Sequence, residues 1–139
     1  MTKEELALAE QLLLVGSAKK KCKILGGKAE IELASLTTGD QLDVESEMRT
    51  VEGTPAFMVH TYSLKLVSQV LKSVTYNGAA IEFTTVADAH QYLLSRPSSL
   101  VDAVINEHTK FEKELAAIAR MDTLVENFTE APPVDSAQS

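Results

Sequence analysis

The sequence contains no tryptophan and only one cysteine, and aromatic residues make up 5% of its 139 positions. Because Cys22 is alone, the chain cannot form an internal disulfide or a zinc site built from several cysteines. No apolar run approaches the length of about 18 residues that a membrane-spanning helix needs. The N-terminal segment carries charges at positions 3, 4, 5 and 10, whereas a secretory signal is uninterruptedly apolar after its basic start. We therefore expect a cytoplasmic protein that does not contact a membrane.

Motifs for catalysis are also missing. The three histidines, His60, His90 and His108, lie far apart and form no ligand pair of the HExxH kind. Lysines beside Cys22 favour a lowered pKa of its thiol, but the sequence offers neither a base nor an oxyanion hole next to it. We therefore expect no catalytic residue and no metal site, and we predict that the protein is not an enzyme.

One short segment, Gly26–Lys28, ends like a phosphate-binding loop. A Walker loop needs a glycine five positions before Gly27, where Cys22 stands, and a serine or threonine after the lysine, where Ala29 stands. The segment therefore predicts a turn rather than a nucleotide site, and we expect no cofactor.

The charge is divided unevenly along the chain. Residues 1–30 hold six basic and four acidic residues, whereas residues 31–139 hold seven basic and sixteen acidic residues. The resulting charges of +2 and −9 sum to the net −7, and an acidic body disfavours contact with nucleic acid. The lysine run 19–23 is able to meet an acidic partner, but without interleaved aromatic residues it is interpreted as a solvated linker.

The longest predicted element is a helix from Ser99, capped with Asp102, to Phe128. Its apolar positions alternate in steps of three and four, as in a heptad seam. They are Val101, Val104, His108, Phe111, Leu115 and Ile118, with Val125 resuming the series after Asp122. Such a helix is roughly 43 Å long, which exceeds the width of a domain of this size. We therefore expect part of it to project or to meet another chain, with His108 either a polar specificity element or simply packed.

A short amphipathic helix is predicted at the N-terminus. Thr2 and Glu5 form a capping box, Leu6 and Leu13 lie on its apolar side, and Gly16 ends it. Because glycine and the lysine run separate it from the rest, it is able to dock on its own domain or on a partner.

The middle of the chain predicts two hairpins and three helices. Strands flank Gly26-Gly27, and Asn77-Gly78 fits a type I′ turn between Val74 and Phe83. Helices are expected from the Thr37 cap to Val51, from Thr54-Pro55 to Val74 as a largely buried element with Tyr62 as a core ring, and from Thr85 to Arg96. Carboxylates at positions 40, 43, 45 and 47 suggest a cation site, but their spacing favours a solvated acidic face.

These elements predict a small α+β domain, mostly helical, with two short β-hairpins and a long C-terminal amphipathic helix. We divide the chain into an N-terminal helix and basic linker (1–22), a single domain (23–128) and a disordered tail (129–139).

The segment from Ile31 to Asp40, the Tyr62–Val74 helix with Asn77-Gly78, and Leu100 to Phe111 resemble small tail proteins of contractile-tailed phages. The nearest families are the tail assembly chaperones and the baseplate hub assembly proteins of T4-like phages. The resemblance implies a non-enzymatic protein that binds tape-measure, hub or baseplate polypeptides in the host cytoplasm during assembly. A structural component of the virion tail, and a small adaptor domain of a cellular complex, are alternatives.

Under each of these hypotheses, apolar helix faces bind the partner, which is another protein or a second copy of the chain. The residues that we expect at that interface are Leu6, Leu13, Phe111, Leu115, Ile118, Met121, Leu124, Val125 and Phe128. If the seam is external, aspartate at Phe111 or Leu115 should weaken binding more than folding.

Overall fold

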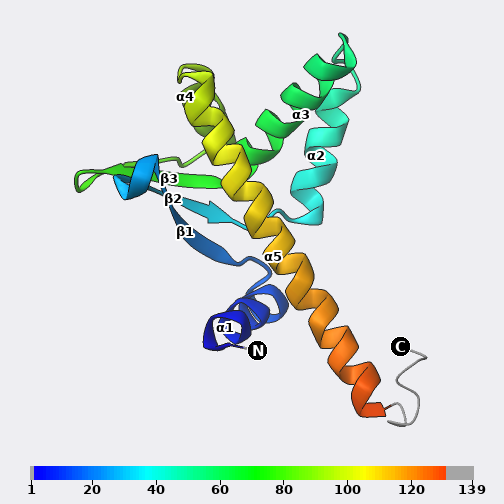
Figure 1. Ribbon diagram of the computed structural model, residues 1–139. Coiled ribbons are helices and arrows are strands. Elements are labelled where there is room, and N and C mark those ends of the chain that lie inside the picture. The colour runs from blue at the N-terminus through cyan, green and yellow to red at the C-terminus, as the bar shows by residue number, and fades with distance from the viewer. Residues whose placement is uncertain (1, 131–139) are drawn as a thin grey trace.

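A four-stranded antiparallel sheet in the order β1-β2-β3-β4 lies at the centre of the protein, crossed by one long helix (Figure 1). The computed structural model describes residues 2–130, and the side chains of residues 2–120. The elements are α1 (Lys3–Glu10), a π-helical turn (Gln11–Val15), β1 (Lys19–Ile24), a 3-10 turn (Leu25–Gly27), β2 (Ala29–Ala34), α2 (Thr38–Met48), α3 (Pro55–Val70), β3 (Leu71–Tyr76), β4 (Ala79–Glu82), α4 (Val86–Leu94) and α5 (Ser98–Glu130). The predicted α+β class with a long C-terminal helix is confirmed.

The lysine run is strand β1 and not a linker, so the predicted boundary at residue 22 falls inside the sheet. Cys22 and Ile24 are buried, while Lys21 and Lys23 are exposed and lie opposite Glu32 and Glu30 of β2. The alternation of exposed and buried residues at the end of β1 was not recognised in the sequence, because lysine is uncommon in strands. Lysines on an edge strand hinder pairing with other chains, which accounts for their place here.

The second hairpin follows the prediction and the first differs from it. Asn77 and Gly78 have φ angles of 51° and 78°, as a type I′ turn requires. The connection between β1 and β2 is longer than the expected Gly-Gly pair, because Leu25 also takes a positive φ and the Lys28 amide closes the turn on the Leu25 carbonyl.

Helix α3 is shorter and more exposed than predicted. It ends at Val70, and β3 begins at the next residue, so Val74 lies in a strand. Only its last turn is buried, around Val67 and Val70, whereas Phe57 is 52% exposed and Val59 65%. The reason is that α2 and α3 form an arm that extends beyond the sheet, so little of the protein covers the start of α3 (Figure 1).

Helix caps explain where most helices begin. The capping boxes at Thr2 and Thr37 are present, and the Thr85 hydroxyl accepts a hydrogen bond from the Asp88 amide. The predicted Ser99 cap of α5 is wrong, because α5 begins at Ser98 and the carbonyl of Pro97 accepts its first hydrogen bonds.

The apolar stripe of α5 forms part of the core, which corrects the predicted partner surface. Phe111 and Ile118 are each 1% exposed and Leu115 is buried, so these three side chains are not available to a partner in this structure. Helix α1 contacts α5, and its Leu8 belongs to the same apolar cluster. Because α1 packs on α5, the apolar core extends along α5 as far as Ile118.

The other predicted residues of α5 lie beyond the part of the chain whose side chains are described; they are Met121, Leu124, Val125 and Phe128. Of the expected tail, residues 129 and 130 belong to α5, and residues 131–139 lie outside the described residues.

Replacement of Phe111 tests the burial of α5. Phe111→Ala should lower the free energy of unfolding by about 3–5 kcal/mol, because it removes a fully buried ring and leaves a cavity. Urea denaturation followed by circular dichroism measures this change. Leu14→Ala, at an exposed leucine, is the control and should change stability by less than about 0.5 kcal/mol. Equal effects of the two replacements would contradict the structure.

Candidate functional site

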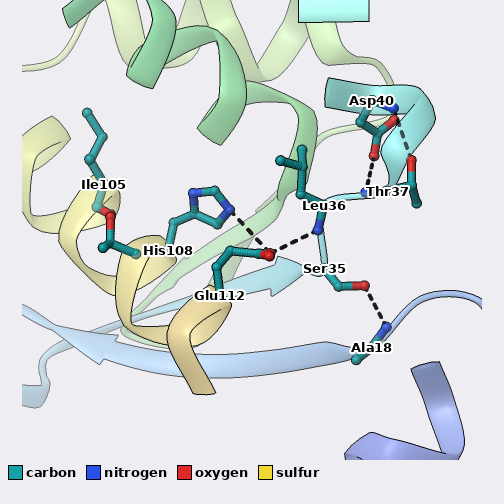
Figure 2. A network of polar contacts seen from close by, with 9 residues as sticks. Ala18, Ser35, Leu36, Thr37, Asp40, Ile105, His108 and Glu112 are labelled. Atoms are coloured by element: carbon teal, nitrogen blue, oxygen red, sulfur yellow. Dashed lines mark hydrogen bonds and ion pairs between the residues drawn. The ribbon is translucent and has the colours of Figure 1, made fainter. Parts of the chain in front are cut away.

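The segment Ser35–Asp40, on which the family resemblance largely depends, is the junction between β2 and α2 (Figure 2). Ser35 exchanges two hydrogen bonds with Ala18: its hydroxyl accepts from the Ala18 amide at 2.9 Å, and its amide donates to the Ala18 carbonyl at 2.7 Å. Thr37 and Asp40 cap α2 reciprocally. The side chains of Ser35, Thr37 and Asp40 are therefore occupied in holding the junction to the start of β1 and to α2.

Glu112 ties the same junction to α5. The Leu36 amide donates to Glu112 Oε2 at 2.9 Å, from 76 positions away in the sequence (Figure 2). An ionised acceptor makes such a bond stronger than one between neutral groups. One carboxylate thus fixes the position of α2 relative to the long helix.

His108 lies one turn before Glu112 and is 7% exposed. Its Nε2 is 3.5 Å from Glu112 Oε2 but has no hydrogen-bond partner, because the distance is at the limit and the geometry is unfavourable. The contact is an ion pair only when the imidazole is protonated. Two interpretations of this seam position were considered, a polar specificity element and a packed side chain. The structure supports the packed side chain, because His108 is buried inside its own domain.

An open groove of about 380 Å³ lies beside this cluster. Leu36, Tyr62, Leu66, Ile105 and Ala116 supply its apolar lining, and Gln41, Ser63, His108, Thr109, Glu112 and Lys113 supply its polar lining. Its lining comes from α3 and α5, with Leu36 of the β2–α2 junction and Gln41 of α2 at its margin. Tyr62, expected as a core ring, is only partly buried and lines this groove.

A second hollow, of about 290 Å³, lies between α3 and α4 and is lined by Lys65, Glu47 and His90 among others. Lys65 Nζ forms an ion pair with Glu47 at 2.9 Å. Burial of the imidazole, with Lys65 nearby, holds the pKa of His90 below its ordinary value. The polar groups of this hollow are thus partly paired with one another.

The N-terminal segment exposes apolar side chains that the sequence associated with a partner. Leu6 is 56% exposed and Leu13 79%, and Leu14 and Val15 are exposed to a similar degree. We call Leu13, Leu14 and Val15 the N-terminal ridge. The ridge is held in place, because Leu8 of the preceding helix is buried and Gln11 Oε1 accepts a hydrogen bond from the Lys19 amide.

The lowered pKa that the sequence suggested for the Cys22 thiol is not favoured by its surroundings. Burial raises the pKa of the Cys22 thiol, with Glu107 adding to the effect, whereas lysines were expected to lower it. The adjacent Lys20 is engaged elsewhere: it forms an ion pair with Glu114 at 2.8 Å and lies 5.9 Å from the centre of the Phe111 ring.

Among the described residues, no group of three or more His, Cys, Asp or Glu side chains is placed to hold a metal ion. Over the same residues, no helix combines the length and apolar character that crossing a bilayer demands. Comparison of the chain with models of protein families, with curated proteins and with solved structures found no match. The phage-tail resemblance therefore stays a prediction.

Removal of the Glu112 carboxylate tests its role at the junction. Glu112→Ala should destabilise the protein by about 1–2 kcal/mol, because the partly buried Leu36 amide loses its acceptor. Glu112→Gln keeps an acceptor oxygen and should cost less than about 1 kcal/mol. Thermal or urea unfolding measures both. Glu114→Ala, which removes an exposed ion pair, is the matched control at about 0–1 kcal/mol, and a larger effect there than at Glu112 would contradict this role.

Proposed function

We propose that the protein is a non-enzymatic binding protein that holds a helical segment of another polypeptide against apolar surface. The observation that carries this proposal is the N-terminal ridge, in which three consecutive large apolar side chains are 73–79% exposed. Removing such side chains from water yields about 1.5–3 kcal/mol each, so a partner that covers them gains affinity. An exposed group of this kind marks an interaction site more often than chance exposure of single residues.

The rigid attachment of the ridge supports the same proposal. Gly16, in a left-handed conformation with φ of 83°, ends the π-helical turn immediately after the ridge. Because Leu8 anchors the preceding helix in the core, the ridge is presented in one orientation. A surface that is ordered before binding loses less conformational entropy when a partner arrives.

The biological setting is proposed from the family resemblance. The client would be a tape-measure, hub or baseplate polypeptide, and the protein would act as an assembly chaperone in the host cytoplasm, with no nucleic-acid or membrane partner. The acidic body of the chain agrees with the absence of a nucleic-acid role. A permanent component of the virion tail is the alternative within this setting, and an adaptor domain of a cellular complex is the alternative outside it.

Charge replacement in the ridge tests the proposal. Leu13→Asp combined with Leu14→Asp should reduce recovery of a long helical tail polypeptide more than tenfold, because two charges enter the apolar contact. The measurement is affinity purification of the tagged protein from cells that assemble tails, with quantitative mass spectrometry. Leu94→Asp, at an exposed leucine of α4, is the control and should leave recovery unchanged.

Recovery that is equal for the ridge variant and the control would contradict the role of the ridge. Quantification of the protein in purified particles then separates the two settings in the tail. An assembly chaperone should be absent from finished particles, whereas a fixed copy number would identify a structural component.

A further inference from the structure

The groove between α3 and α5 offers a second apolar surface, distinct from the N-terminal ridge. Its volume of about 380 Å³ is near the lower end of ligand sites, which enclose roughly 300–1,000 Å³. It is open to solvent and is lined by both apolar and polar side chains. These features fit the insertion of a few large side chains from a helix better than the enclosure of a small molecule.

The two sides of the groove that face α2 and α5 differ in charge. Helix α2, which contributes Gln41 to the lining, carries four carboxylates and no lysine or arginine within Thr38–Met48. Glu47 among them is neutralised by Lys65. Glu45 is beside the groove, because its Oε2 accepts a hydrogen bond from Gln41 Nε2 at 3.1 Å. The wall formed by α5 has Lys113 next to Glu112, so negative charge in excess is confined to the α2 side.

We infer that this groove receives an amphipathic helix of a partner protein, whose apolar ridge enters the groove and whose flank toward α2 carries lysine or arginine. The charge difference between the walls sets which flank must be basic, and therefore how the helix is oriented. The inference extends the proposed function and rests on it, since it describes the chemistry of the helix that is bound.

Two adjacent alanines of α5 allow a matched test. Ala116 lines the groove and Ala117 does not, and both are exposed positions of the same helix. The probe is a synthetic helical peptide with leucines at alternating steps of three and four and lysines on both flanks, titrated by fluorescence anisotropy. Ala116→Trp should weaken binding at least tenfold by filling the groove, and Ala117→Trp should change it less than about twofold.

A second matched pair tests the charge. Glu45→Lys and Asp43→Lys change the net charge equally, but Asp43 is about 200° around the helix from Gln41 and Glu45 is one turn away. Glu45→Lys should weaken binding of the lysine peptide about fivefold, and Asp43→Lys should have less than half that effect. A version of the peptide with glutamates in place of lysines should bind at least tenfold more weakly.

Three results would overturn the inference. Equal effects of the two tryptophan variants would place the peptide elsewhere, and loss of binding only in the Leu13→Asp, Leu14→Asp protein would place it on the N-terminal ridge. A dimer that dissociates on Ala116→Trp would show that a second copy occupies the groove. The titration uses no natural client, so its failure is separate from a failed affinity purification.

Discussion

Burial of the apolar stripe of α5 is the interaction on which the rest of the structure depends. Phe111 and Leu115 enter the core, while Glu112 between them binds the β2–α2 junction and Glu114 pairs with Lys20 of β1. A little more than one turn of helix therefore joins the sheet, the edge strand and the α2–α3 arm. Since contacts of α1 and α3 also converge on α5, the long helix is a scaffold that holds otherwise separate parts together.

Because the apolar stripe of α5 is buried, the candidate binding surfaces lie elsewhere on the protein. The seam of α5 packs inside its own domain. Two other surfaces with apolar character are described, the N-terminal ridge and the groove beside α3. Both are positioned by α5: α1 packs on it, and its residues from Ile105 to Ala116 form one wall of the groove. The two surfaces are thus ordered by the same packing that buries the seam.

Most local signals in the sequence were reliable, apart from the Ser99 cap and the Gly26-Gly27 turn, whereas long-range ones were not. The Thr37–Asp40 cap and the Asn77-Gly78 turn depend on neighbouring residues, so the sequence alone identified them. The period of α5 correctly identified which face is apolar, but periodicity does not say whether that face meets the same chain or another. The bond from Leu36 to Glu112 spans 76 positions and leaves no local pattern, so the groove beside it was not predicted. Only the end of strand β1, next to Gly26-Gly27, was predicted, because the lysines before it suggested a solvated linker.

Hydrogen–deuterium exchange on the isolated protein tests the central claim most directly, because it needs no partner and no substitution. If the stripe of α5 belongs to the core, amides of residues 104–118 should exchange as slowly as those of β2 and β3, through global unfolding alone. Amides of residues 12–15, under the exposed ridge, should exchange earlier. Exchange of residues 104–118 that is faster than that of β2 and independent of it would contradict the account, because the seam would then be separable from the domain.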